Sequence, residues 1–260
     1  MPKKSLGQNF LRDNKILNNI VESGDILNND TILEIGPGTG NLTEVILKKN
    51  PKRFIVIEKD KNLANLLKKK FNSKIQIINK DILDCYDKIN FDVPIKVFGN
   101  LPYNISTKIL TSFIKIENLK SKFEKFIFVF QKEVADRILA EENTKNFGRL
   151  SILTSWKTNK IKIMDIDPKY FFPKPKVWSS LVILTPRLKV EKFKNVKNLE
   201  HLTNIFFNQR RKMIKKPLKQ LFKNYEKIAQ DLDLDLNARP QNIPNKKYLE
   251  LCKLYENLVK

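Results

Sequence analysis

Residues 31–40 of the chain read TILEIGPGTG. The first five form a short apolar run typical of a buried strand, and an apolar helical pattern follows at residues 42–49. Between them, glycines at positions 36, 38 and 40 allow a tight backbone turn and leave room for a ligand to approach without meeting a Cβ atom. A strand, a glycine-rich turn and a helix in this order are typical of a nucleotide-binding crevice.

The turn matches neither of two common phosphate-binding motifs. A P-loop needs a Lys-Ser or Lys-Thr pair after its last glycine, and a GxGxxG motif has glycine where this chain has Asn41. The turn taken alone therefore also fits a plain connection between a strand and a helix.

Further strands and helices are expected to alternate through the first two-thirds of the chain. Apolar runs occupy residues 53–57, 75–78, 95–98 and 126–130, and helical patterns occupy residues 63–70, 106–115 and 132–140. Residues 148–156 show no clear period, and strand-like runs follow at 160–166 and 178–184. The alternation predicts an α/β fold with a doubly wound, largely parallel sheet.

The composition changes at Pro186. Residues 189–197 are highly charged, and the chain beyond them has helical spacing at 199–207, 213–222 and 248–258 without a strand pattern. We therefore expect two domains, a catalytic domain at residues 1–188 and a small helical domain at residues 189–260.

Acidic residues follow the second and third predicted strands. Glu58 lies 22 residues after Gly36, at the end of the strand expected beside the glycine turn, where its carboxylate can accept hydrogen bonds from both hydroxyls of a ribose. Asp81 follows the next strand and can accept a hydrogen bond from the exocyclic amine of adenine. Together the three strand ends predict a crevice for a cofactor that contains adenosine.

The fourth strand ends in Asn100-Leu101-Pro102-Tyr103. These residues fit a turn before a helix, but they also suit chemistry at an aromatic amine. Adenine N6 is a poor nucleophile because its lone pair is delocalised into the ring. The Asn100 side-chain oxygen and a backbone carbonyl at the Leu101-Pro102 turn could accept its two N–H bonds, while the Tyr103 ring stacks on the base.

Charge and composition narrow the function further. The 260 residues include 50 Lys and Arg against 28 Asp and Glu, a net charge of +22 that favours a polyanionic partner such as nucleic acid. Two distant cysteines, Cys85 and Cys252, and a single histidine, His201, argue against a metal cluster or a disulfide scaffold. Because no long apolar stretch is present, we expect a cytoplasmic protein without membrane contact.

Seven motifs occur in a characteristic order: Gly7-Gln-Asn-Phe-Leu11, Glu34-Ile-Gly-Pro-Gly38, Asn100-Leu-Pro-Tyr-Asn-Ile-Ser106, Gln131-Lys-Glu-Val134, Gly148-Arg-Leu-Ser151, Phe171-x-Pro-x-Pro-Lys-Val177 and Phe207-Asn-Gln-Arg-Arg-Lys212. In this set the chain closely resembles the KsgA-type rRNA adenine N6-dimethyltransferases, from residue 3 to about residue 250. The resemblance implies a Rossmann-like class I methyltransferase domain with a small C-terminal all-α domain. It also implies S-adenosyl-L-methionine as methyl donor and no metal.

The resemblance further implies a substrate and partner. The expected substrate is a pair of adjacent adenosines in the 3′-terminal hairpin of 16S rRNA, within the 30S subunit or its precursor, each methylated twice at N6. It implies a role in 30S biogenesis, and we expect the protein to act as a monomer.

Residue roles follow from the same resemblance. It puts Asn9 and Leu11 over the cofactor, Gly36 under its methionine moiety, Glu58 on the ribose, Asp81 on the adenine amine, and Asn100 beside the reacting methyl group. Gly38 is expected to bind the cofactor as well. Phe171 is expected to clamp the flipped adenine together with Tyr103. Two residues depart from the family pattern: Phe172 adds a second aromatic ring beside Phe171, and Trp178 stands where a small or polar residue is expected.

A basic cluster in the predicted helical domain is the candidate RNA-binding surface. It comprises Arg210, Arg211, Lys212, Lys215 and Lys216. We expect the neighbouring apolar residues Phe206, Phe207, Met213 and Leu218 to hold it rigidly, as phosphate binding requires. Lys3, Lys4 and Arg12 are expected to extend this basic track.

Three alternatives stay open. A large-subunit rRNA adenine methyltransferase of the macrolide-resistance type shares the glycine turn and the Asn-x-Pro-Tyr motif, although residues 207–212 and 239–243 favour the small-subunit enzyme. A protein glutamine or DNA adenine methyltransferase fits less well. A non-catalytic RNA-binding assembly or transcription factor could keep the fold, but intact Glu58, Asp81 and Asn100 argue against it.

Overall fold

The structure is a computed structural model that describes residues 8–87, 91 and 93–258. By internal contacts the chain divides into two compact units, of which the first contains residues 1–135 and 159–187 and the second residues 136–158 and 188–260. Residues 136–158 thus pack with the C-terminal residues. The predicted functional domains, 1–188 and 189–260, instead place this segment in the first domain. These functional limits stay a prediction.

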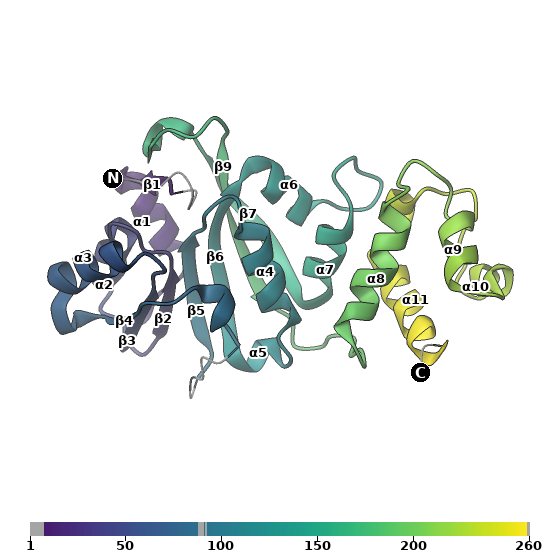
Figure 1. Cartoon of the computed structure of the whole chain (residues 1–260), viewed down its shortest axis with the longest axis horizontal. Helices are drawn as coiled ribbons and strands as arrows, with labels where there is room; N and C mark the ends of the chain where they lie inside the picture. Colours follow the sequence, from purple (N-terminus) through teal and green to yellow (C-terminus); the bar gives the residue numbers. More distant parts are fainter. Residues whose placement is uncertain (1–7, 88–90, 92, 259–260) are drawn as a thin grey trace. The chain divides into compact units, whose positions relative to one another are not determined.

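A seven-stranded sheet in the order β4-β3-β2-β5-β6-β9-β7 forms the centre of the first unit (Figure 1). Its strands are β2 (Thr31–Ile35), β3 (Arg53–Ile57), β4 (Gln76–Ile78), β5 (Ile95–Asn100), β6 (Phe123–Gln131), β7 (Thr158–Ile166) and β9 (Ser179–Pro186). Pairing is parallel from β4 to β6, and β9 pairs antiparallel with β6. The predicted doubly wound α/β sheet is confirmed, with the strands at 31–35 and 53–57 correct to the residue.

Helices cover both faces of this sheet because each buries one apolar stripe. The helices of the first unit are α1 (Asn14–Glu22), α2 (Asn41–Leu47), α3 (Lys61–Phe71), α4 (Ser106–Lys115), α5 (Leu119–Lys122) and the start of α6 (Lys132–Leu139). Side chains of α1, α2 and α3 share one core cluster with Ile32, Val56 and Phe98 of the sheet. On the other face, the ring of Phe113 in α4 packs against Phe123 and Phe126 of β6.

A small antiparallel pair joins two segments that are distant in sequence. Strand β1 (Phe10–Leu11) pairs with β8 (Phe171–Phe172), so that Phe10 lies opposite Phe172. This pair was not predicted, because two-residue strands are too short to show a period. Four short 3-10 helices complete the described structure, η2 (Asn72–Lys74), η3 (Ile82–Asp84), η4 (Pro168–Tyr170) and η5 (Pro240–Asn242).

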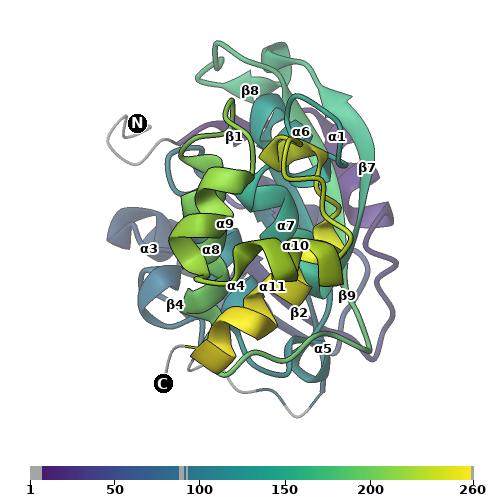
Figure 2. The same ribbon diagram turned by 90° about the vertical axis from the view of Figure 1, so that its right-hand side faces the viewer.

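The second unit is built mainly from helices (Figure 2). These are α7 (Arg149–Lys157), α8 (Val196–Phe207), α9 (Lys215–Leu221), α10 (Tyr225–Asp231) and α11 (Asn245–Leu258). Residues 148–156 showed no helical period because both apolar and polar side chains of α7, such as Ile152 and Thr154, are buried. The predicted helix at 213–222 is shorter in the structure, and Met213 is 55% exposed, so its predicted anchoring role is wrong; Ile214 is buried instead.

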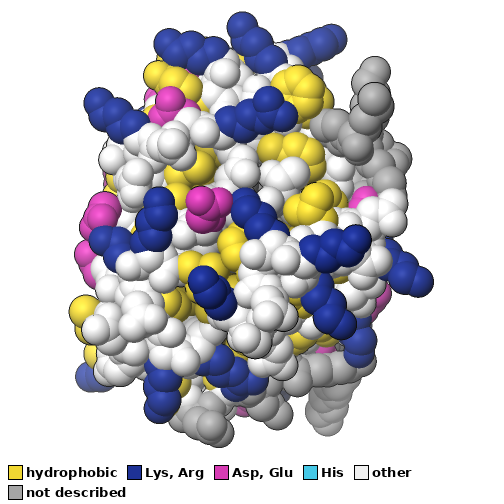
Figure 3. Space-filling model, turned by 90° about the vertical axis from the view of Figure 1, so that its left-hand side faces the viewer, with side chains coloured by type: hydrophobic (Ala, Val, Ile, Leu, Met, Phe, Trp, Pro, Cys, Tyr) yellow, Lys and Arg dark blue, Asp and Glu magenta, His cyan; other side chains and the backbone are white. Residues whose placement is uncertain are grey.

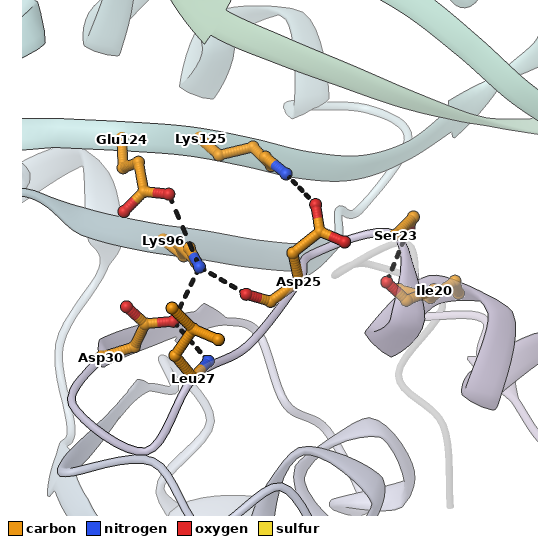
Figure 4. A network of polar contacts seen from close by, with 8 residues as sticks. All are labelled: Ile20, Ser23, Asp25, Leu27, Asp30, Lys96, Glu124 and Lys125. Carbon is orange, nitrogen blue, oxygen red and sulfur yellow. Dashed lines mark hydrogen bonds and ion pairs between the residues drawn. The ribbon is translucent and has the colours of Figure 1, made fainter.

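A buried lysine joins the amino-terminal ends of the central strands (Figure 4). The Lys96 side chain, 3% exposed, donates hydrogen bonds to the Asp25 carbonyl at 2.6 Å and to Asp30 Oδ2 at 2.7 Å. Its Nζ atom also lies 3.5 Å from Glu124 Oε1. Its neighbour Lys125, which is half-buried, pairs with the exposed Asp25 carboxylate at 2.6 Å. The network therefore ties the loop before β2 to β5 and β6.

We predict that Lys96→Ala lowers the free energy of unfolding by about 3–5 kcal/mol, because it leaves the Asp30 carboxylate and the Asp25 carbonyl without their buried cation. Urea unfolding followed by circular dichroism measures the change. Lys125→Ala is the matched control and should cost about 0–1 kcal/mol, since its partner is exposed. Equal costs for the two variants would contradict this account of the network.

Candidate active site

The carboxyl ends of four parallel strands, β2, β3, β4 and β5, open onto one pocket with a volume of about 210 Å³. The N-terminal segment at residues 8–11 also lines it. Ten of the residues predicted for the site meet here: Asn9, Leu11, Gly36, Gly38, Glu58, Asp81, Asn100, Leu101, Pro102 and Tyr103. Gly36, Glu58, Asp81 and Asn100 come together here because the carboxyl ends of successive parallel strands lie at one edge of the sheet.

The three glycines of the turn have different surroundings. All have positive φ angles, 65° at Gly36, 58° at Gly38 and 81° at Gly40. A Cβ atom at Gly38 would lie 2.6 Å from the Phe10 ring, and one at Gly40 would lie 2.5 Å from the Phe71 ring, so both positions are closely packed. A Cβ atom at Gly36 would meet nothing within 4 Å. The backbone at Gly36 thus borders open space in the pocket, where a ligand can contact it directly.

Glu58 is held beneath the pocket by backbone groups. Its side chain accepts hydrogen bonds from the Gly38 N–H at 3.1 Å and from the Asp60 N–H at 2.8 Å. Burial raises the pKa of Glu58, and these two N–H donors partly oppose the shift. Because each carboxylate oxygen can accept more than one hydrogen bond, the fixed carboxylate can still bind ligand hydroxyls.

Asp81 lies at the end of β4 with both oxygens engaged. Oδ1 accepts a hydrogen bond from the Leu83 N–H at 2.9 Å, and Oδ2 pairs with Lys59 Nζ at 2.8 Å. Burial favours the neutral acid, but the hydrogen bonds and the charge of Lys59 outweigh it, so the pKa of Asp81 lies below its usual value. The residue is therefore an ionised acceptor at the pocket wall.

Two asparagine amides hold the N-terminal segment at the pocket. Asn100 Nδ2 donates to the Asn9 carbonyl at 2.7 Å, and Asn41 Nδ2 donates to the Leu11 carbonyl at 2.7 Å. With Asn100 oriented in this way, its side-chain oxygen is the group that can accept from a substrate amine. Asn41, which breaks the GxGxxG pattern, was not predicted as a site residue; its only sequence signal was that mismatch.

Tyr103 is fixed at the pocket by a contact with β9, which lies two strands from β5 in the sheet. Its hydroxyl lies 2.6 Å from Ser179 Oγ at the start of β9. Burial raises the pKa of the Tyr103 hydroxyl, and the Ser179 hydrogen bond partly opposes the shift. The tyrosine is therefore a neutral aromatic surface with a fixed hydroxyl. The Pro102 carbonyl closes the preceding turn by accepting from the Ile105 N–H at 3.1 Å.

Phe171 is not brought to the pocket. Its side chain is 4% exposed and belongs to the core cluster that also contains Leu11 and Leu17. Phe172 is 46% exposed, and the Arg12 guanidinium carbon lies 4.0 Å from its ring centroid. Phe10 was missed as an individual site residue, although it fills the space above Gly38 and lines the pocket.

The basic cluster occupies the turn between α8 and α9 and the first residues of α9. All five of its side chains, Arg210, Arg211, Lys212, Lys215 and Lys216, are exposed. The turn is anchored where the Ile214 N–H donates to the Ala238 carbonyl at 2.9 Å, and Arg210 donates to the Lys145 carbonyl at 2.6 Å. Arg12, which was predicted to extend the basic track, is an exposed residue of the first unit. Lys3 and Lys4, predicted for the same track, lie outside the described residues, as does Gly7 of the first motif.

None of the helices described is long and apolar enough to cross a membrane. Within the same residues, no group of three or more His, Cys, Asp or Glu side chains is arranged to hold a metal ion.

The chain is similar to known sequences over nearly its whole length. The sequence pattern of a family described as ribosomal RNA adenine dimethylase matches residues 2–257. A ribosomal RNA small subunit methyltransferase A from Pelagibacter ubique is 54% identical over 256 residues, which cover 98% of this chain and 97% of that protein.

Solved structures share the fold. A dimethyladenosine transferase from Plasmodium falciparum has a TM-score of 0.76 and 25% identity over 95% of this chain and 98% of that chain. The 23S rRNA methyltransferase ErmE has a TM-score of 0.71 and 23% identity over 95% of this chain and 99% of that chain. The predicted Rossmann-like methyltransferase fold with a helical C-terminal part is confirmed.

Glu34 is a buried carboxyl group in β2 that lines the pocket. Its side chain is 2% exposed, and its Oε2 accepts a hydrogen bond from Thr43 Oγ1 at 2.7 Å. Burial raises the pKa of Glu34 from 4.5 to about 8, against the opposing Thr43 hydrogen bond. Between these values the folded chain holds a proton that the unfolded chain has released.

We predict that this group makes the folded state progressively less stable as pH rises from 4.5 to about 8. Glu34→Gln, which is neutral at every pH, should remove this part of the dependence. Urea midpoints measured across the window test the expectation, with Glu117→Gln on the surface as the control. A pH dependence unaltered by Glu34→Gln would refute the assignment.

Proposed function

Because this chain belongs to the ribosomal RNA adenine dimethylase family, we propose that it methylates N6 of two adjacent adenosines in the 3′-terminal hairpin of 16S rRNA, twice each. The chain is an S-adenosylmethionine-dependent rRNA methyltransferase. The substrate we propose is the 30S subunit or its precursor, and the proposed setting is the cytoplasm, with the protein acting as a monomer in 30S biogenesis.

One observation carries the proposal: the pocket combines a cofactor crevice with an acceptor for an aromatic amine. The open space at Gly36, the fixed carboxylate of Glu58 and the ionised Asp81 suit an adenosine-containing cofactor. Asn100 lines the same pocket. We assign Gly36 to the methionine moiety, Glu58 to the ribose and Asp81 to the adenine amine. Asn9 and Leu11 are assigned to the segment that covers the cofactor, and Gly38 is a further cofactor-binding residue.

The chemistry that we propose needs no charged base. S-adenosylmethionine supplies an electrophilic methyl group when it is bound. The Asn100 side-chain oxygen and the carbonyl at the Leu101-Pro102 turn accept the two N–H bonds of adenine N6, which leaves its lone pair directed at the methyl carbon. The alkylated nitrogen is acidic and loses its proton to solvent. The two acceptors therefore stabilise charge that develops mainly in the transition state.

Aromatic stacking would hold the flipped adenine during transfer. Tyr103 provides one ring, which is fixed by the hydrogen bond between its hydroxyl and Ser179. We propose Phe171 as the second ring; because its side chain is buried in the core, stacking requires β8 to shift and bring the ring to the base. The proposed division of labour places catalysis in residues 1–188 and rRNA binding in residues 189–260.

We predict that Asn100→Ala abolishes methyl transfer to small ribosomal subunits while S-adenosylmethionine still binds, as measured by calorimetry. Asn104→Ala is the matched control because Asn104 also lines the pocket but lies outside the proposed acceptor pair. In cells, mass spectrometry of 16S rRNA should show that deletion of the gene removes N6,N6-dimethyladenosine and that only the wild-type gene and Asn104→Ala restore it. Unchanged modification after deletion would overturn the proposal and direct attention to 23S rRNA or to a binding role alone.

The basic cluster should make rRNA binding depend steeply on salt. Contacts to about 6–10 phosphates would lower the affinity by about 10³–10⁵ between about 50 and about 200 mM salt. Replacing both Lys215 and Lys216 by Ala should reduce the slope of log affinity against log salt by about 2. The control replaces Lys227 and Lys246, which are exposed lysines elsewhere in the same unit. If both double variants change the slope equally, the cluster is not a specific contact surface.

A further inference from the structure

Three large apolar side chains are exposed within seven residues of the first unit. Phe172 is 46% exposed, Val177 44% and Trp178 48%. We call this set the aromatic shelf. Large exposed apolar patches mark contact surfaces, whereas single exposed apolar side chains are ordinary. The catalytic chemistry proposed above does not use Val177 or Trp178.

The aromatic shelf adjoins the pocket at two points. Phe172 pairs with Phe10, which lines the pocket, in the β1–β8 sheet (Figure 2). Trp178 immediately precedes Ser179, whose hydroxyl bonds to Tyr103 in the pocket wall. The shelf therefore lies at the end of the sheet where the target base would enter.

The backbone at Trp178 is well fixed. Its carbonyl accepts a hydrogen bond from the Lys132 N–H at 2.9 Å. The next two residues are fixed as well, Ser179 by Tyr103 and Ser180 by a 2.6 Å hydrogen bond to Asp165 Oδ1. A ring presented on such a backbone loses little freedom when a flat ligand stacks on it.

The surroundings of the shelf are cationic. Residues 168–178 contain three lysines, Lys169, Lys174 and Lys176, of which Lys169 lies 3.9 Å from the Asp167 carboxylate just before this range. Arg12 stacks over the Phe172 ring, at 4.0 Å from its centroid. Figure 3 shows Lys and Arg side chains spread over one side of the first unit, with hydrophobic side chains between them. Flat apolar rings among positive charges suit single-stranded nucleic acid, whose bases stack while its phosphates meet the cations.

We propose that Trp178 stacks on a nucleobase adjacent to the target adenosine and so positions the rRNA strand over the pocket. This inference rests on the proposed rRNA methylation and adds a positioning residue to it. Trp178 contacts neither the reacting nitrogen nor the methyl group. Its loss should therefore weaken binding of the RNA and leave the chemical step intact.

The test separates substrate affinity from turnover in methyl transfer to small ribosomal subunits isolated from cells that lack the gene. Trp178→Leu should raise KM for the subunits by about 5- to 150-fold with kcat unchanged, the range expected for one stacked base. Trp178→Phe, which keeps a flat ring, should recover most of the affinity. Leu66→Ala, which removes an exposed apolar side chain from α3, should leave KM unchanged.

Fluorescence gives a second readout on the wild-type chain. The chain has two tryptophans, and Trp156 is only 3% exposed, so a stacked base should quench mainly the emission of Trp178. A short single-stranded RNA with two adjacent adenosines should quench the wild type and not Trp178→Phe. An abasic nucleotide on each side of the adenosine pair should abolish the quenching.

The two proposals fail in different ways. Wild-type transfer to the subunits, together with an unchanged KM for Trp178→Leu or equal losses for Trp178→Leu and Trp178→Phe, would overturn the stacking and leave the methyltransferase function standing. Unquenched wild-type emission would also overturn it. Absence of transfer by the wild type would overturn the proposed function and, with it, the assignment of the stacked base as a neighbour of the target.

Discussion

Parallel pairing of β2 with β3 and β5 is the constraint on which the candidate site depends. The register sets Ile35 opposite Ile57, and it sets Glu34 opposite Phe98, two residues before Asn100. The glycine turn, the Glu58 carboxylate and the Asn100 amide therefore emerge at one edge of the sheet. A shift of one residue in any of these strands would turn its buried side chains to the opposite face, so the packing of both faces protects the geometry of the site.

A second constraint on the site is the anchoring of the N-terminal segment. The N-terminal segment reaches the pocket through the carbonyls of Asn9 and Leu11, which are held by Asn100 and Asn41. The β1–β8 pair fixes the same segment against Phe171 and Phe172. The proposed cover of the cofactor, the proposed acceptor for adenine and the segment that carries the aromatic shelf are thus mechanically linked, and Asn100 has a structural contact as well as its proposed catalytic one.

The sequence predicted the site more completely than it predicted the packing around it. Strand ends with Gly36, Glu58, Asp81 and Asn100 could be placed together, because parallel strands bring their carboxyl ends to one edge. Helix α7 could not be assigned because burial on several sides removes the helical period. The burial of Phe171 beside an exposed Phe172 depends on pairing with β1, a contact across more than 150 residues that no local pattern encodes.

The crystal structure of the chain with S-adenosylhomocysteine bound tests the central claim most directly, that the ends of β2 to β5 form the cofactor site. We expect the ligand in the pocket, with its amino acid part at Gly36, its ribose hydroxyls on Glu58, its adenine amine at Asp81 and its sulfur facing Asn100. A ligand bound elsewhere, or in this pocket with its adenine at Asn100, would contradict the account.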